Sequence, residues 1–177
     1  MALKSSIYKA QLQVSDMDRN YFAEHALTLA RHPSETEERL MARLLAFALR
    51  ASERLQFARG LSDIEEPDIW AHDYGGDLLE WIEVGQPDER RLQKAQAKAP
   101  SVWILCYAHA ANIWFKQLEG KLARSDRLQV WYLPTAQSQQ LATLCQRNMQ
   151  VQVTIQDGAI WFTVDQECVE LTPQRWL

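Results

Sequence analysis

The sequence has no long apolar run, little glycine or proline, and few cysteines. No apolar stretch approaches the roughly 18 residues of a membrane-spanning helix, and the first residues lack the apolar core of a signal peptide. We therefore expect a cytosolic protein without a membrane partner. Six glycines and six prolines exclude collagen-like and low-complexity sequence. Three cysteines, far apart and in no C-x-x-C pair, exclude a disulfide framework and a zinc finger.

What remains is ordinary globular composition. The 177 residues are 47% hydrophobic and 24% charged, which predicts a single domain over residues 1–177 with a packed core. The formal net charge is −4, whereas a general polyanion binder is normally basic. A nucleic-acid partner would therefore have to bind through a local basic patch. The chain has no Gly-rich phosphate loop and no motif for a Ser-His-Asp or Cys-His site.

The first third of the chain combines period-2 and helical patterns. Apolar and polar residues alternate over 8–14, which predicts a strand. Apolar spacing predicts a helix over 20–31. Ser34 and Glu37 have the spacing of a capping box, which predicts that Ser34 accepts a hydrogen bond from the backbone of Glu37 and that a helix covers about 35–53.

Helical and apolar segments alternate further along the chain. Pro87 favours the first position of a helix that ends near Pro100. Apolar runs predict strands at 102–107 and 128–133, and helices are expected at 110–123 and 135–148. This crossover order predicts an α/β fold with one mixed sheet of four or five strands, flanked by helices. Asp157-Gly158 predicts the turn of a C-terminal antiparallel hairpin over about 149–170.

An earlier hairpin, centred on Gly75-Gly76, carries the candidate chemistry. Its register places Asp68 opposite Glu83 and Trp70 opposite Trp81. Directly opposed side chains have Cβ atoms about 5 Å apart, and like charges in that relation are destabilising. A divalent cation such as Mg²⁺ or Mn²⁺ would compensate the two carboxylates. A neighbouring Arg or Lys would do so too, which makes an ordinary surface ion pair the alternative interpretation.

Charged residues on two predicted helices could complete such a site. Glu38 lies in the first turn after the expected cap, where an acid also simply suits the helix dipole. Arg90, Arg91 and Lys94 follow Glu83 on the next helix, where residues three or four apart share one side. A lysine there could contact an attacking water or a phosphate. The alternative is that these residues are solvated charges of a helix surface.

Several segments resemble the YaeQ family. They are Ser34-Glu35-Thr36-Glu37-Glu38-Arg39, Arg54-Leu55-Gln56-Phe57-Ala58-Arg59-Gly60-Leu61, the run from Trp81 to Arg91, and Ile155-Gln156-Asp157-Gly158-Ala159-Ile160-Trp161. The resemblance runs over nearly the whole chain. It implies a restriction-endonuclease-like core of the PD-(D/E)XK nuclease type, with a mixed central sheet between helices and an endonuclease-like metal site.

The resemblance also assigns roles to single residues. Asp68, after Pro67, matches the proline-aspartate element, and Glu83 matches the second acidic position; these two would hold Mg²⁺ or Mn²⁺. Glu38 is the candidate helix glutamate. The nuclease pattern has lysine two residues after the second acid, but this chain has Gly85, so Lys94 is the candidate migrated equivalent.

Two functions remain open from the sequence. The first is a metal-dependent, nuclease-like phosphodiesterase in which Asp68, Glu83, Glu38 and Lys94 are catalytic. Arg90 and Arg91 would then be assigned to bind phosphate. The second is a non-catalytic interaction or regulatory protein with a degenerate nuclease core and a protein partner. Gly85 and the acidic net charge favour the second.

Overall fold

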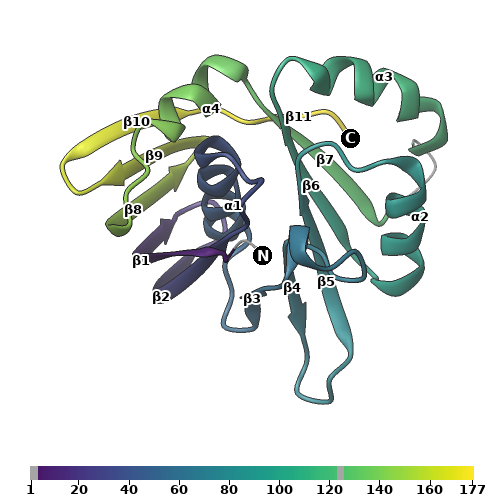
Figure 1. Cartoon of the computed structure of the whole chain (residues 1–177), viewed down its shortest axis with the longest axis horizontal. Helices are drawn as coiled ribbons and strands as arrows, with labels where there is room; N and C mark the ends of the chain where they lie inside the picture. Colours follow the sequence, from purple (N-terminus) through teal and green to yellow (C-terminus); the bar gives the residue numbers. More distant parts are fainter. Residues whose placement is uncertain (1–3, 123–125) are drawn as a thin grey trace. The chain divides into compact units, whose positions relative to one another are not determined.

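The computed structural model describes residues 4–122 and 126–177 (Figure 1). The chain divides into two compact units. Unit 1 consists of Met1–Ala51 and Ala136–Pro173, and unit 2 of Ser52–Thr135 and Gln174–Leu177. Each unit contains its own sheet, so the one sheet of four or five strands expected from the sequence is wrong. The single domain over 1–177 stays a prediction.

Unit 1 is built on a five-stranded mixed sheet. Its spatial order is β10-β9-β8-β1-β2, in which β1 and β8 run parallel and the other neighbours antiparallel. The strands are β1 (Ser6–Asp16), β2 (Tyr21–Arg31), β8 (Asn148–Gln156), β9 (Ala159–Val164) and β10 (Glu167–Leu171). Two helices accompany the sheet, α1 (Glu37–Arg50) and α4 (Thr135–Ala142).

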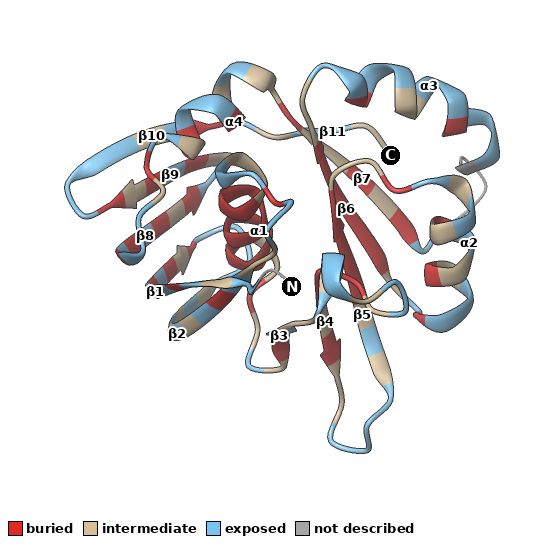
Figure 2. Cartoon of the chain, viewed as in Figure 1, coloured by how far each residue is buried: buried red, intermediate tan, exposed pale blue. Residues whose placement is uncertain are grey.

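Alternation along the strands gives this sheet one apolar and one polar face. In β1, Ala10, Leu12 and Val14 are buried while the residues between them are exposed, as expected for a half-buried strand. Figure 2 shows the same banding in β8 and β9. The strand predicted at 8–14 is therefore confirmed. The hairpin register is also confirmed, since Val151 pairs with Val164 and Ile155 with Ile160.

The helix predicted over 20–31 is wrong, because these residues form strand β2. All eleven residues of β2 pair with β1 in an unbroken antiparallel register from Tyr21 to Arg31. Its odd-numbered residues are less exposed than the even-numbered ones between them, so the segment has a real period of 2. Strand pairing along the full length overrides the apolar spacing that suggested a helix.

Helix α1 begins later than predicted. Its N-cap is Thr36, whose hydroxyl accepts a hydrogen bond from the Arg39 backbone at 3.1 Å, so the predicted capping box at Ser34 is wrong. The Ser34 hydroxyl instead lies 2.6 Å from His32 Nδ1. The helix ends at Arg50 rather than 53. All nine residues from Leu40 to Ala48 are buried.

Unit 2 is built on a six-stranded mixed sheet of order β11-β7-β6-β5-β4-β3. The strands are β3 (Leu55–Phe57), β4 (Ile69–His72), β5 (Leu78–Val84), β6 (Val102–Tyr107), β7 (Leu128–Leu133) and β11 (Gln174–Arg175). A short 3-10 helix, η1 (Gly60–Ser62), precedes β4. Helices α2 (Glu89–Lys98) and α3 (Ala110–Leu122) connect the three parallel strands β5, β6 and β7.

The crossover pattern predicted from the sequence is confirmed in unit 2. Residues of α2 and α3 share one core cluster with β5, β6 and β7, which includes Trp81, Leu92, Ile104, Leu118 and Val130. Both helices lie beside these strands in Figure 1. The prediction that α3 continues to residue 123 lies outside the described residues. No described helix is long and apolar enough to cross a membrane.

Two helix boundaries differ from the prediction. Asp88 caps α2 by accepting a hydrogen bond from the Arg91 backbone at 2.8 Å, so Pro87 lies before the helix and not at its first position. Helix α4 ends at Ala142, not near Asn148, where β8 already begins. Pairing with β1 draws residues 148–155 into the sheet.

Candidate functional site

The β4–β5 hairpin sets the position of the two candidate acids. Ile69 pairs with Ile82 and Trp70 with Trp81, the register expected from a turn centred on Gly75-Gly76. Asp68, one residue before β4, therefore lies level with Glu83 near the end of β5. A bulge falls between Ala71 and His72, so it lies between the turn and the acids: His72 pairs with Leu78 beside the turn, and Ala71 with Glu80 after the bulge.

Asp68 is enclosed by backbone. Its Oδ2 accepts a hydrogen bond of 2.8 Å from the Val84 backbone N–H, which ties the carboxylate to β5. A Cβ added at Gly60 would lie 2.7 Å from Asp68 Oδ1, so any larger residue here would force the acid or the loop to shift. Gly60 also has a φ of +52°, which favours glycine.

Glu83 is 3% exposed and receives two hydrogen bonds on one oxygen. The Trp81 indole N–H donates to Oε1 at 2.8 Å, and Arg91 Nε donates to the same atom at 2.7 Å. Burial raises the pKa of Glu83 to about 7, and the negative charge of Asp68 adds to the rise, whereas Arg91 and Trp81 oppose it. The two acids therefore interact as like charges in a buried setting.

Arg91 links the acid pair to the loop before β4. Besides Glu83, its guanidinium donates to the backbone carbonyl of Ile64 at 3.1 Å and to that of Glu66 at 2.8 Å. One side chain from the first turn of α2 thus bridges β5 and the loop 60–67. Arg91 was expected to bind phosphate; in the structure it is an ion-pair partner of Glu83.

The other predicted site residues are Lys94 and Arg90 on α2 and Glu38 on α1. Lys94 forms an ion pair with Glu65 Oε1 at 2.5 Å, and Lys98 reaches the other oxygen of Glu65 at 3.4 Å. Arg90 is exposed on α2. Glu38 lies in the first turn of α1, in unit 1, so its part in the site stays a prediction.

Asp68 and Glu83 are a two-carboxylate set. Among the described residues, no group of three or more His, Cys, Asp or Glu side chains is placed to hold a metal ion. Two carboxylates still suit Mg²⁺, which usually keeps several waters and binds through one or two acidic side chains. The donor chemistry therefore fits Mg²⁺ or Mn²⁺, with the Arg91 guanidinium as a competing positive charge.

Sequence reasoning missed two contributors to this site. The sequence favours Trp81 as a packing residue, yet it donates a hydrogen bond to Glu83. The signal was its spacing, because residues two apart on a strand share a face. Nothing in the sequence around Gly60 indicated that it lies beside Asp68, because this close approach depends on the path of the loop.

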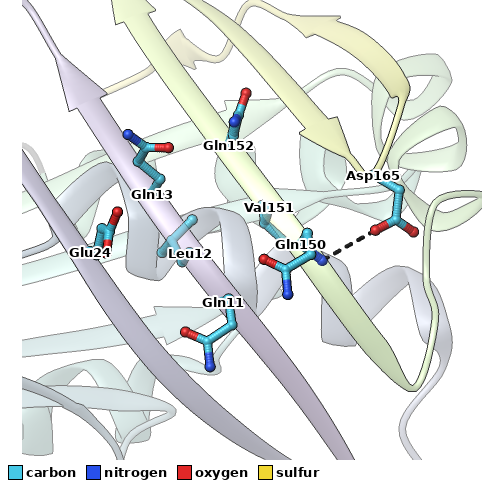
Figure 3. Close-up of a pocket in the computed structure, with 8 residues that line it drawn as sticks. All are labelled: Gln11, Leu12, Gln13, Glu24, Gln150, Val151, Gln152 and Asp165. Carbon is cyan, nitrogen blue, oxygen red and sulfur yellow. Dashed lines mark hydrogen bonds between the residues drawn. The ribbon is translucent and has the colours of Figure 1, made fainter.

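A concave surface lies on the polar face of the unit 1 sheet (Figure 3). It has a volume of about 210 Å³. Its lining consists of Gln11, Leu12, Gln13, Glu24, Gln150, Val151, Gln152 and Asp165. Strand pairing sets Gln11 beside Gln150 and Gln13 beside Gln152. Because both ionisable side chains of this lining are acidic, the groove does not suit a phosphate group.

Fold and site together define a mixed α/β protein with two opposed, buried carboxylates beside an arginine. A family model described as YaeQ protein matches residues 1–173, and the chain belongs to the YaeQ family. The "Uncharacterized protein YaeQ" of Salmonella typhi is 50% identical over 179 residues, which cover 99% of this chain and 98% of that protein. The protein of the same name from Escherichia coli (strain K12) is 48% identical with the same coverage.

Two solved structures show the same fold. The crystal structure of the YaeQ protein from Xanthomonas axonopodis pv. citri matches with a TM-score of 0.93 at 46% identity, covering 97% of this chain and 98% of that one. The YaeQ protein from Pseudomonas syringae matches with a TM-score of 0.93 at 34% identity, covering 98% and 96%. The resemblance to the YaeQ family seen in the sequence is confirmed.

Proposed function

We propose that the protein is a metal-dependent, nuclease-like phosphodiesterase of the PD-(D/E)XK type, in which Asp68 and Glu83 hold Mg²⁺ or Mn²⁺. The observation that carries the proposal is the opposition of two buried carboxylates at the end of one hairpin. Burying like charges together is costly unless a cation compensates them. If the two acids had only a structural role, apolar side chains of similar size would fill the same space at a lower cost in folding free energy.

The surrounding residues could share the work of phosphodiester hydrolysis. A divalent cation bound here would polarise a phosphoryl oxygen and lower the pKa of a bound water. Arg90, exposed on α2, is free of the acid pair and would bind a phosphate of the substrate. Lys94 would orient the attacking water, which requires that it leave Glu65.

Calorimetry with MnCl₂ tests the metal site. We expect one site in the wild-type protein and its loss in Glu83→Gln and in Asp68→Asn, which keep the shape of each side chain. Asp77→Asn, an exposed acid in the turn of the same hairpin, is the matched control and should keep the site. Absence of binding in the wild type would contradict the proposal.

Cleavage assays test the reaction. Supercoiled, linear and single-stranded DNA, and RNA, are incubated with the protein and Mn²⁺. We expect hydrolysis of at least one substrate by the wild type and by Asp77→Asn, and none by Asp68→Asn. Cleavage that survives in Asp68→Asn would show that another site or a contaminant is responsible.

A non-catalytic interaction or regulatory protein is the second candidate. Gly85 stands where the nuclease pattern has lysine, and the candidate replacement Lys94 is paired with Glu65. Arg91 already supplies a positive charge to Glu83. If the wild type neither binds Mn²⁺ nor cleaves nucleic acid, the results favour this second function, with a protein as its partner.

A further inference from the structure

The Arg91 guanidinium lies beside Glu83, where a positive charge can compensate a buried carboxylate. It donates to Glu83 Oε1 at 2.7 Å, and its side chain is only a quarter exposed. Its two other contacts are backbone carbonyls, of Ile64 and Glu66, on the loop that leads into Asp68. One positively charged group thus pairs with Glu83 and also holds the loop that leads into Asp68.

A divalent ion and this guanidinium would use the same carboxylate. Both need oxygen atoms of Glu83, and both are positively charged, so close approach of one opposes the other. An arginine stays protonated at all relevant pH values, so it cannot relieve the conflict by losing its charge. Movement of the guanidinium away from Glu83 would relieve the conflict.

We propose that Arg91 is an intrinsic cationic latch, which occupies the acid pair in the metal-free protein and is displaced from Glu83 when Mg²⁺ or Mn²⁺ binds. The inference rests on the proposed metal site and adds its regulation. Displacement of Arg91 also removes its hydrogen bonds to Ile64 and Glu66. Metal loading is thereby coupled to loosening of the loop 60–66.

Other contacts of the loop 60–66 limit how far it loosens when Arg91 leaves. Ser62 and Asp63 donate to the backbone carbonyls of Arg59 and Gly60 at 3.0 and 3.1 Å, and these short-range bonds do not involve Arg91. Lys94 and Lys98 still pair with Glu65, although this exposed pair contributes little. The loop is therefore expected to become more dynamic without detaching.

Released Arg91 would gain a second role. A guanidinium binds phosphate through paired N–H donors, which is the role that the nuclease-like hypothesis gives to this residue. The latch accounts for both assignments, because the same side chain pairs with Glu83 before metal binding and is free for phosphate after it.

Metal affinity of the full chain gives the first test. MnCl₂ is titrated by calorimetry at pH 8 into wild type, Arg91→Gln and Arg90→Gln. Arg90 is the neighbouring exposed arginine of the same helix and makes the matched control. We expect Arg91→Gln to bind Mn²⁺ at least about tenfold more tightly than the other two proteins, because a competing positive charge is gone.

The outcomes separate the latch from the metal site. Equal Mn²⁺ affinity of wild type and Arg91→Gln overturns the latch and leaves the proposed function intact. No Mn²⁺ binding by either protein overturns both. A tenfold gain confined to Arg91→Gln supports the latch.

Hydrogen exchange of the wild type gives a second test that needs no variant. At saturating MnCl₂ we expect backbone amides of residues 60–66 to exchange at least about tenfold faster than without metal. The turn 73–77 belongs to the same unit and is closed by hydrogen bonds between Asp73 and Asp77, so its exchange should not change. Unchanged exchange over 60–66 in metal-saturated protein would overturn the latch even if Arg91→Gln failed to fold.

Discussion

Asp68 accepts a hydrogen bond of 2.8 Å from the backbone of Val84, so one acid of the pair is fixed to the strand that carries the other. The loop before β4 reinforces this tie, because Ala58 donates to the backbone carbonyl of Asp68 at 2.9 Å and Gly60 to that of Pro67 at 3.0 Å. Asp68 is therefore held by main-chain bonds, and its position should survive conservative changes in neighbouring side chains.

Removing the charge of Asp68 should lower the pKa of Glu83. The negative charge of Asp68 is the second cause of the raised pKa, after burial, so Asp68→Asn removes one cause and keeps the acceptor for Val84. Carbon-13 NMR titration of the glutamate carboxyl groups measures the shift. Asp77→Asn should leave the Glu83 titration unchanged, and an unchanged pKa in Asp68→Asn would mean that the two acids do not interact.

Stability should depend on pH through Glu83. Its pKa is about 7 in the folded protein and 4.5 in the reference state, so the folded protein holds the proton more strongly. The resulting stabilisation is complete below pH 4.5 and is lost as the pH rises through about 7, a total loss of about 3 kcal/mol. Urea unfolding without divalent ions should show a loss of this size in wild type but not in Glu83→Gln.

The exposed Glu119 provides the control for this pH profile. Glu119→Gln should retain the wild-type decline between pH 4.5 and 7. A flat profile in the wild type, or an equal decline in Glu83→Gln, would show that Glu83 does not titrate in this range.

Alanine should have opposite effects at two glycines of unit 2. Gly60→Ala places a Cβ 2.7 Å from Asp68 Oδ1 at a φ of +52°, and we expect a loss of about 2 kcal/mol in unfolding free energy. Gly120 lies in α3 with nothing within 4 Å of an added Cβ, so Gly120→Ala should stabilise the protein by up to about 1 kcal/mol. Urea denaturation measures both, and a neutral Gly60→Ala would contradict the close approach.

A buried ion cluster should dominate the stability of the α1 region. Glu35 receives hydrogen bonds from Arg39 at 2.6 Å and from Arg43 at 2.7 and 2.8 Å, and both Glu35 and Arg43 are buried. Glu35→Ala leaves a buried guanidinium without its carboxylate, which should cost about 3 kcal/mol in unfolding free energy.

Glu37→Ala tests whether this loss is specific to the cluster. Glu37 is exposed in the first turn of α1, where an acid contributes at most about 1 kcal/mol. Similar losses at Glu35 and Glu37 in thermal unfolding would indicate that the ion cluster contributes no more than a helix-end charge.

Local patterns predicted the hairpins well. Asp157-Gly158 fixed the register of its strands, because a short turn leaves few ways to pair the residues on either side. The register predicted from Gly75-Gly76 is found at Trp70 and Trp81, but the turn alone does not set it: His72 pairs with Leu78 beside the turn, and the bulge between Ala71 and His72 restores the predicted pairing towards Asp68 and Glu83. Predictions that depend on pairing between strands were wrong. Residues 20–31 were predicted as a helix but form a strand paired with β1, and the helix predicted to reach residue 148 ends earlier because residues 148–155 pair with β1 in parallel.

The partners of the acid pair could not be predicted from spacing. Nothing in the sequence shows that Arg91 turns towards Glu83 and the carbonyl of Glu66, since this depends on where α2 packs and on the path of a loop. The pairing of Lys94 with Glu65 joins residues that are likewise brought together by tertiary structure. Long-range placement of charged side chains follows from the packed fold.

The parallel alignment of β1 with β8 has a consequence for synthesis on the ribosome. Strand β1 is synthesised long before its parallel neighbour β8, which begins at Asn148, and the Asp18 carboxylate accepts hydrogen bonds from the backbone of Asp157 and Gly158 at 2.7 and 3.0 Å. The sheet of unit 1 therefore needs two distant segments of the chain, whereas most of unit 2 is one continuous stretch. During translation one edge of β1 stays unpaired until β8 is made, and an unpaired strand edge promotes aggregation.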